Sequence, residues 1–217
     1  MNCGEKAAMK LICDYSTQKN LDLLTQAYRL RHKVFVEEMG WHDLRKPDGL
    51  EIDQFDTEDA VNMFLVEGGE VIGYQRMLST LRPHLLSHVF PHLCDVEAPT
   101  GPDVWELTRF CTERNGDKER EKMIRREMLH AAVAWGLENG VDRFLFESDP
   151  YRMLQMLHLH FRIVPLGVPH KIDGEDVIAC VAHFNSATLR RLDELRRNSN
   201  VTFIRTDGFN RQFTKAV

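Results

Sequence analysis

Apolar residues recur at helical spacing near the beginning of the chain. Positions i, i+4, i+7 and i+11 form one apolar stripe, which consists of Leu23, Ala27, Leu30 and Val34. This spacing predicts an amphipathic helix over residues 19–38, with Ser16 as its N-cap. A second stripe beside the first contains Leu24, Tyr28, Arg31 and Phe35. Arg31 therefore lies among apolar and aromatic neighbours, where its guanidinium either snorkels to water or meets an anion.

The rest of the chain alternates between strand-like and helix-like segments. Residues 60–68 and 70–80 are apolar segments joined by Gly68-Gly69, which predicts a β-hairpin. Further strands are predicted over 8–15, 103–113, 142–148 and 176–184, and helices over 84–93, 118–139, 150–161 and 185–198. Residues 40–60 form a long polar loop, and loops of this length are often functional. Central strands with helices between them predict an α/β (α+β) sandwich with a mixed sheet.

The composition favours one globular domain. With 217 residues, 43% of them hydrophobic, we expect a single domain over 1–217 whose tail, 199–217, is polar and loosely held. The net charge of −5 argues against nucleic acid as the main partner, because phosphate binding needs a basic surface. Neither a membrane-spanning apolar run nor a signal-peptide pattern is found, so we expect a cytoplasmic protein that does not bind membranes. The scattered cysteines predict reduced thiols.

Charged residues that interrupt apolar segments are the main candidates for a functional site. They are three guanidiniums and three carboxylates: Arg31, Arg76, Arg109, Asp53, Asp56 and Glu106. Burying any one of these groups alone costs several kcal/mol, so each must pair, contact water or contact a ligand. Ion pairs between the loop 40–60 and the sheet would explain a single such residue. The convergence of all six favours a ligand site.

The order and spacing of these charges and of nearby aromatic residues form a series of motifs. The motifs are R-x-x-x-F at Arg31 and Phe35, then Trp41, D-x-x-D at Asp53 and Asp56, G-x-x-R at Gly73 and Arg76, and E-x-T-R-F from Glu106 to Phe110. Together they resemble the signature of LuxI-type N-acyl-homoserine lactone (autoinducer) synthases over residues 28–112. From about residue 115 the chain resembles this family only in its element order and in Gly167.

The resemblance implies a three-layer fold similar to that of the GNAT acetyltransferases, with helices on both faces of a central mixed, V-shaped sheet. It also implies an acyltransferase of quorum sensing whose substrates are S-adenosylmethionine and an acyl thioester. The α-amine of the methionyl part attacks the thioester. The methionyl carboxylate then closes the lactone and expels methylthioadenosine. The reaction needs neither a cofactor nor a metal, because the sulfonium is already an activated leaving group.

The chemistry of S-adenosylmethionine gives the motif residues their expected roles. The amine needs a general base, for which Glu106 is the first candidate and Asp53 the second. Arg109 is expected to orient the methionyl carboxylate or Glu106 itself. Phe35 and Trp41 are expected to contact the adenine or the sulfonium by stacking and cation–π interaction.

The remaining motif residues are expected to hold the long loop and the substrate. Arg31 is expected to anchor the loop carboxylates or the anion of the substrate, and Arg76 to hold the loop carboxylates, Asp56 among them. Thr108 is a weaker substrate-binding candidate, since the family often has Ser there. Phe110 ends the motif and is also expected to bind substrate.

Glu106 and Arg109 pose a geometric problem, because they are three residues apart on a predicted strand. Regular alternation places them on opposite faces of the sheet. One small substrate can contact both only at a splayed strand edge, or if a β-bulge near residues 107–108 resets the alternation. We therefore expect broken strand pairing between about residues 105 and 110.

Two segments favour coenzyme A over acyl carrier protein as the source of the acyl group. Residues 45–56 and 84–93 resemble the smaller branch of the family that uses acyl-CoA. A basic cluster could contact a CoA phosphate, an acyl carrier protein or only water. It consists of Arg114, Lys118, Arg120, Lys122, Arg125 and Arg126. The acyl chain and the oligomeric state stay open.

Two other functions are compatible with the sequence. One is a GNAT-like N-acyltransferase acting on another amine, although residues 114–119 lack the Gly-rich pyrophosphate loop expected there. The other is a non-catalytic ligand-binding module with the acidic loop as a lid. His88 and His92 have metal-like spacing, but a third ligand is missing nearby, so we expect a surface pair and no metal site.

Overall fold

A computed structural model of the protein describes residues 8–15, 18–197 and 199–205. Its α-helices are α1 (Leu21–Arg31), α2 (Leu85–His88), α3 (Lys118–Glu138), α4 (Pro150–Leu157) and α5 (Ser186–Leu195). A π-helical segment, His32–Glu38, continues α1. The strands are β1 (Met9–Tyr15), β2 (Val61–Glu67), β3 (Glu70–Ser79), β4 (Val104–Thr112), β5 (Arg143–Ser148), β6 (Arg162–Pro165), β7 (His170–Ile172), β8 (Glu175–His183) and β9 (Thr202–Arg205).

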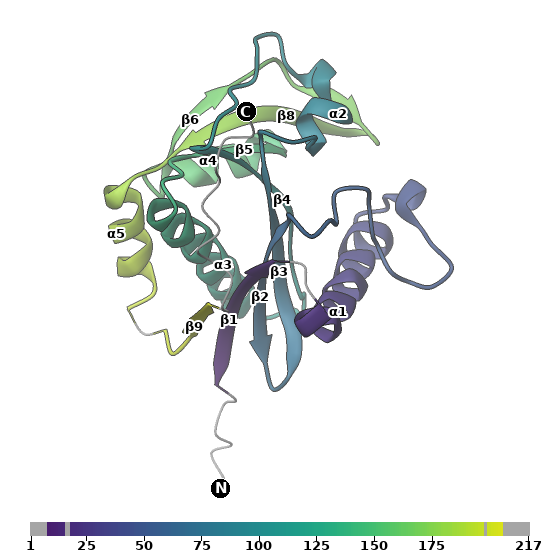
Figure 1. The fold of residues 1–217 in the computed structure, drawn as a ribbon, viewed down its shortest axis with the longest axis vertical. Coiled ribbons are helices and arrows are strands. Elements are labelled where there is room, and N and C mark those ends of the chain that lie inside the picture. The colour runs from purple at the N-terminus through teal and green to yellow at the C-terminus, as the bar shows by residue number, and fades with distance from the viewer. Residues whose placement is uncertain (1–7, 16–17, 198, 206–217) are drawn as a thin grey trace, which may run out of the picture.

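The strands form a mixed sheet in the order β6-β8-β5-β4-β3-β2-β1-β9, with β7 paired to β8. The β4–β5 and β1–β9 pairs are parallel, and the other pairs are antiparallel. In the described part of the chain, β4 and β5 pair only where Val104–Glu106 meets Arg143–Leu145, and the strands then diverge (Figure 1). The sheet is therefore split in a V between β4 and β5.

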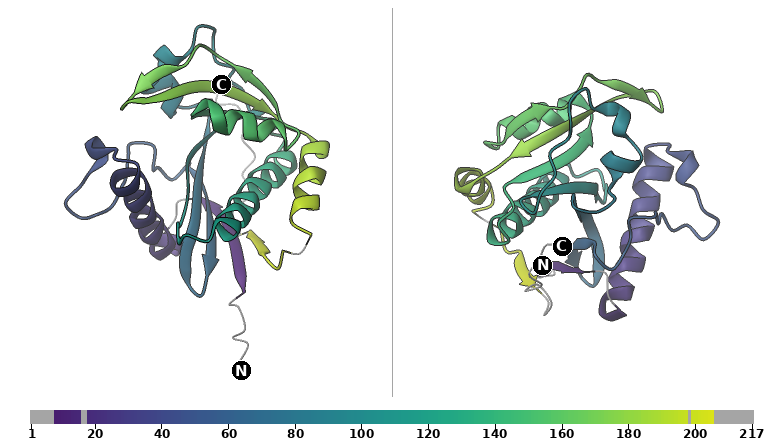
Figure 2. Two further views of the ribbon diagram at one scale, coloured as in Figure 1. Left: turned by 180° about the vertical axis from the view of Figure 1, so that it is seen from behind. Right: turned by 45° about the horizontal axis from the view of Figure 1, so that its top comes forward.

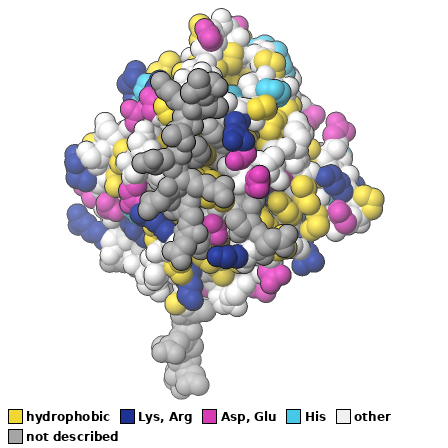
Figure 3. All heavy atoms as spheres, in the orientation of Figure 1, with side chains coloured by type: hydrophobic (Ala, Val, Ile, Leu, Met, Phe, Trp, Pro, Cys, Tyr) yellow, Lys and Arg dark blue, Asp and Glu magenta, His cyan; other side chains and the backbone are white. Residues whose placement is uncertain are grey.

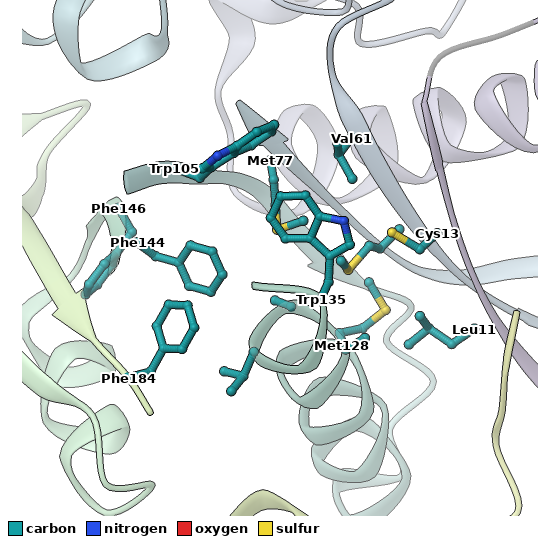
Figure 4. Close-up of a cluster of buried hydrophobic side chains, with 14 of the residues drawn as sticks. Leu11, Cys13, Val61, Met77, Trp105, Met128, Trp135, Phe144, Phe146 and Phe184 are labelled. Carbon is teal, nitrogen blue, oxygen red and sulfur yellow. The ribbon is translucent and has the colours of Figure 1, made fainter. Parts of the chain in front are cut away.

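Different helices cover the two faces of the sheet. Figure 2 shows α3, α4 and α5 on one side of the strands and α1 on the other. On the α3 side, Trp135 of α3 packs edge-on against Trp105 of β4, with ring centroids 4.9 Å apart, in the largest buried cluster (Figure 4). On the other side, α1 packs on β3, and α2 packs on β4 and β5. This second face carries the charged residues of the motifs.

Local sequence signals explain several element boundaries. Gly68 and Gly69 have φ of 60° and 94°, in the left-handed region that the β2–β3 turn requires. The carboxylate of Asp117 accepts from the backbone N–H groups of Glu119 and Arg120 and caps α3. Asp149 caps α4 in the same way, with Pro150 in its first turn. The long helix and the hairpin therefore agree with their predictions.

The fold class is as predicted, and the differences are local. The first helix begins later than expected, at Leu21, after Asn20, whose side chain makes no capping hydrogen bond, while the expected cap, Ser16, lies outside the described residues. The short strands β6, β7 and β9 were not predicted. Strand β9 pairs with β1, so part of the expected loose tail is ordered on the sheet, and residues 206–217 lie outside the described part. Among the described helices, none is long and apolar enough to cross a bilayer.

Candidate active site

Arg31 is fully buried at the end of α1 and binds two carboxylates of the loop between α1 and β2. Its Nε donates to Glu51 Oε2 at 2.5 Å, and Nη1 and Nη2 donate to the two carboxylate oxygens of Asp56 at 2.7 and 2.9 Å. The pairing with Asp56 is bidentate, the strongest geometry for a guanidinium and a carboxylate. Arg31 therefore meets anions inside the protein and does not snorkel to water.

Arg76, on β3, is equally buried and binds the same loop from the sheet. Its Nη1 donates to Asp53 at 2.7 Å and to Asp56 at 2.6 Å, and its Nη2 donates to Asp53 at 2.9 Å. Its Nε donates to the hydroxyl of Thr108 on β4 at 3.1 Å. The prediction that Arg31 and Arg76 order the loop through these two aspartates is confirmed.

Arg109 joins the same group from β4. Its Nε and Nη2 donate to the carboxylate of Glu51 at 3.1 and 3.2 Å, and Nη2 lies 2.7 Å from Asp53 Oδ2. Glu51 is only 1% exposed and is absent from the residues predicted from the sequence. Its position between Leu50 and Ile52 is the same kind of apolar context that identified the other charges, and that signal could have found it.

These six side chains are called the ion-pair cluster: Arg31, Arg76, Arg109, Glu51, Asp53 and Asp56. Burial alone would raise the pKa of each carboxyl group, but the guanidiniums outweigh it. Hydrogen bonds and charge from Arg76 lower the pKa of Asp53, and the charge of Arg76 together with a hydrogen bond from Arg31 lowers the pKa of Asp56. The charge of Arg109 does the same for Glu51. The three carboxylates are therefore ionised at neutral pH and balance the three guanidiniums.

A β-bulge in β4 turns Arg109 toward the ion-pair cluster. The regular pairs on its two sides are Tyr74–Cys111 and Arg76–Thr108. Between them Arg109 and Phe110 lie opposite a single residue of β3, Gln75. The extra residue resets the alternation, so that Arg109 reaches the face on which Glu106 also lies.

The predicted break in strand pairing is confirmed, but it lies at residues 109–110 and not at 107–108. Thr108 keeps its place in the ladder opposite Arg76, where its hydroxyl accepts from the guanidinium, so the extra residue follows it. Arg109 has a φ of 54°, in the left-handed region that is unfavourable for any residue with a Cβ. Such backbone strain is concentrated at functional sites in proteins.

Aromatic rings and a cavity adjoin the ion-pair cluster. The rings of Phe35 and Trp41 are stacked, with centroids 5.1 Å apart and an interplanar angle of 11°. The guanidinium of Arg109 lies 5.7 Å from the centroid of Phe35. A cavity of about 450 Å³ is lined by Asp43, Leu44, Arg45, Lys46, Glu51, Ile52, Asp53 and Gln54. Contact of Phe35 and Trp41 with an adenine or a sulfonium stays a prediction.

Glu106 lies on this face of the sheet but outside the ion-pair cluster. Its two carboxylate oxygens accept from the backbone N–H groups of Leu85 and Leu86, at 2.8 and 2.6 Å, at the start of α2. Burial raises the pKa of Glu106, although these hydrogen bonds oppose the shift. Arg109 donates to Glu51. The third carboxylate that balances the three guanidiniums is therefore Glu51, and not Glu106 as expected from the sequence.

Some predicted or possible site residues lie elsewhere. Phe110 packs against the core on the α3 side of the sheet, away from the other motif residues. Burial raises the pKa of the Cys111 thiol to about 12, so it is not a thiolate nucleophile at neutral pH. The ring of His92 packs edge-on against that of His170. In the described part of the chain, no three His, Cys, Asp or Glu side chains are placed to hold a metal ion.

Comparison with known proteins gives a consistent picture. The autoinducer synthase family matches residues 14–192. The isovaleryl-homoserine lactone synthase of Bradyrhizobium diazoefficiens is 32% identical over 169 residues, which is 77% of this chain and 76% of that protein. An acyl-homoserine-lactone synthase of Ralstonia solanacearum is also 32% identical over 169 residues, 75% of this chain and 82% of that protein.

Solved structures show the same likeness. The structure of the CoA-dependent acyl-homoserine lactone synthase BjaI with MTA has a TM-score of 0.83 at 29% identity, and covers 92% of this chain and 95% of that chain. An acyl-CoA N-acyltransferase from Pseudomonas aeruginosa, at 15% identity and a TM-score of 0.53 over 80% and 99% of the two chains, shares the fold alone.

The fold is the GNAT-like α/β fold of acyltransferases. More narrowly, this chain belongs to the autoinducer synthase family, whose members are acyl-homoserine lactone synthases. It is therefore an enzyme, and the interpretation as a non-catalytic binding module is excluded.

Proposed function

We propose that this synthase condenses S-adenosylmethionine with an acyl-CoA, forms an N-acyl-homoserine lactone and releases methylthioadenosine. The observation that carries the proposal is the ion-pair cluster. Arg109, which the β-bulge turns toward this cluster, donates to Glu51 of the acidic loop and lies close to the ring of Phe35. The likeness to BjaI supports it, since that enzyme has been solved with SAM and isopentyl-CoA, with a TM-score of 0.82 at 28% identity.

Arg109 is the guanidinium best placed to receive the methionyl carboxylate. The side chains of Arg31 and Arg76 are fully buried, whereas that of Arg109 is 8% exposed. In the described structure, its hydrogen bonds and ion pairs use Nε and Nη2, so Nη1 is the atom to offer a substrate anion. Arg31 and Arg76 hold the loop that carries the other half of the cluster.

Glu106 is the proposed general base. The substrate ammonium gives a proton to Glu106, directly or through one water, and the free amine attacks the thioester carbonyl. The new C–N bond forms, the C–S bond to coenzyme A breaks, and the thiolate takes up a proton. The methionyl carboxylate then attacks its own γ-carbon, and the sulfonium leaves as neutral methylthioadenosine. Over the whole reaction one proton is released.

The donor is proposed to be a CoA thioester, because the basic cluster 114–126 offers little free charge to an acidic carrier protein. Three of its arginines pair with carboxylates: Arg114 with Glu38, Arg120 with Glu67 and Arg125 with Glu121. Figure 3 shows positive and negative side chains intermixed on one face of the molecule. Docking of an acidic carrier protein would need a surface of uniform positive sign.

The test is a donor competition. Purified protein is incubated with S-adenosylmethionine and either a mixture of acyl-CoAs or acyl carrier proteins bearing the same chains. Methylthioadenosine is quantified, and mass spectrometry of the lactone identifies the acyl group. We expect turnover with acyl-CoA that changes little between low and physiological salt, where the Debye length is about 8 Å. Turnover with carrier protein alone would overturn the choice of donor, and no methylthioadenosine with either would overturn the function.

We further propose that the whole chain is one synthase domain and that it works in the cytoplasm. Both proposed substrates are polar metabolites, and the described helices contain no membrane span.

A further inference from the structure

Glu147, near the end of β5, is a carboxyl group that neither the motifs nor the proposed mechanism uses. Its Oε1 is buried, and no donor of a hydrogen bond is placed near it in the described structure. A buried carboxylate oxygen without a donor is costly, so this group needs a proton or a partner. The residue itself is only partly buried, unlike Glu106, whose exposure is 0%.

The register of the sheet places Glu147 beside Glu106. Glu106 pairs with Leu145 across the parallel β4–β5 ladder, at the last pair before the strands diverge. Glu147 is two residues beyond Leu145 and therefore lies on the same face of the sheet as Glu106. The charge of Glu106 raises the pKa of Glu147, and a hydrogen bond between two carboxyl groups requires a proton on one of them.

The surroundings favour the proton on Glu147. Glu106 already accepts two backbone hydrogen bonds, which stabilise its ionised form, whereas Glu147 has one oxygen without a donor. Burial, and then the charge of Glu106, raise the pKa of Glu147 well above its usual range. The other titratable or charged groups around the pair are His84 before α2, Arg76 on β3, Arg109 on β4, Cys94 and Cys180.

We propose that Glu147 is a positioning residue for Glu106: the two carboxyls share one proton, and Glu147 carries protons between the buried Glu106 and solvent. The inference rests on the proposed function and extends it. Glu106 is 0% exposed and both of its oxygens are held by backbone N–H groups of α2, so a proton that it accepts does not pass directly to bulk solvent. Glu147 lies on the same face of the sheet, two residues beyond the partner of Glu106, and as a residue it is only partly buried, so we assign the route outward to it.

The proton balance is as follows. In the resting pair Glu147 is protonated and Glu106 is ionised. The substrate ammonium gives its proton to Glu106, the amine attacks, and the expelled CoA thiolate takes a proton back from the pair. After the C–N bond has formed, the nitrogen loses a second proton to give the amide. This proton goes to Glu106 and reaches solvent through Glu147. No oxidant, reductant or further reactant is needed.

Three variants test the proposal through the rate of methylthioadenosine release as a function of pH. Glu147→Gln keeps a hydrogen-bond donor toward Glu106 but cannot carry a proton. Glu147→Leu removes both the donor and the proton. Ser148→Ala, at the next position of β5, is the matched control. Thermal unfolding and calorimetric binding of S-adenosylmethionine show whether each variant is folded and binds substrate.

For Glu147→Gln we expect kcat to fall about 100-fold, the lower range for an acid–base group, with both KM values within about twofold of wild type. Glu147→Leu should lose a similar factor and also move the acidic limb of the pH profile upward, because Glu106 has lost a donor to its ionised form. Ser148→Ala should match wild type. Wild-type kcat and an unchanged pH profile in Glu147→Gln would overturn the role of Glu147. An inactive wild-type enzyme that binds S-adenosylmethionine would instead overturn the proposed function.

Discussion

Two groups of buried carboxylates lie on the same face of the sheet and have opposite electrostatics. In the ion-pair cluster, Glu51, Asp53 and Asp56 each contact guanidiniums, and their pKa values are lowered. In the carboxyl pair, Glu106 accepts hydrogen bonds from backbone N–H groups, Glu147 lies on the same face of the sheet, and the pKa values of both are raised. The difference comes from guanidiniums in direct hydrogen-bonding contact: they outweigh burial in the ion-pair cluster, whereas the more distant charges of Arg76 and Arg109 do not outweigh it in the carboxyl pair.

This difference separates two tasks. A carboxylate paired with guanidiniums stays ionised throughout the physiological range, so it can hold a loop or a substrate but cannot exchange protons there. A carboxyl group whose pKa is raised toward neutrality can accept and donate protons at working pH. We therefore propose that the ion-pair cluster does the positioning and that the carboxyl pair does the acid–base chemistry.

The largest effect is expected from Arg76→Met. The change keeps aliphatic bulk but leaves Asp53 and Asp56 with one guanidinium fewer in a buried site. Removing one partner of a buried ion pair costs about 3–5 kcal/mol, so we expect a loss of this size in the free energy of unfolding at pH 7. Urea denaturation measures it.

Arg82→Met is the matched control. Arg82 pairs with Asp59 at the surface, where its side chain is 64% exposed, and such pairs are worth about 0–1 kcal/mol. Equal losses in the two variants would show that the buried cluster is no more important to stability than a surface ion pair.

The next largest effect is expected on activity, from Arg109→Met. Arg109 is at the edge of the cluster, and Glu51 keeps its contact with Arg31 when Arg109 is removed, so the fold should persist. The methionyl carboxylate would lose its guanidinium, and we expect kcat/KM to fall by about 100-fold or more, since an unpaired buried charge costs about 3 kcal/mol. Normal turnover in a folded variant would remove Arg109 from the mechanism.

The sequence predicted those elements whose signals are local. The long helix α3 has an apolar stripe and a capping aspartate, and the β2–β3 hairpin has its two glycines. The strands β6, β7 and β9 have 4, 3 and 4 residues. Such segments are too short for periodicity to identify, and pairing with β8 or β1 decides that they are strands.

The site was predictable as a set of charges but not as a set of partners. Motif order identified Arg31, Arg76 and Arg109, and the signs required carboxylates nearby. The apolar neighbours of Glu51 mark it as a candidate like the other charges, but its contacts with Arg31 and Arg109 depend on how the loop lies over the sheet, which no local pattern encodes. Glu147 was missed because its importance comes from the strand register alone.

One Glu→Gln substitution in each carboxylate group tests the opposite directions of their pKa shifts. Glu51→Gln should lower the free energy of unfolding at pH 7 by about 2 kcal/mol, because Arg31 and Arg109 lose a charged acceptor. The folded pKa of Glu51 is lowered, so its contribution is present above its unfolded pKa of about 4.3 and is lost as pH falls through the folded value. Unfolding curves of wild type and variant should therefore converge in acid, and a constant difference down to pH 3 would contradict the assignment.

Of these substitutions, Glu147→Gln should change the free energy of unfolding least, and it should raise this free energy where the others lower it. The folded pKa of Glu147 is raised, so the folded state binds more protons than the unfolded chain above about pH 4.3, and wild-type stability falls as pH rises toward the folded pKa. Glutamine does not titrate, and so the variant should gain stability relative to wild type as pH rises above about 4.3 toward the folded pKa, by about 1.4 kcal/mol for each unit of pKa difference. Urea unfolding at several pH values measures this difference, with Ser148→Ala expected to follow wild type throughout. Parallel curves for wild type and Glu147→Gln would mean that Glu147 is ionised in the folded protein, and the two carboxylate groups would then share the same electrostatics.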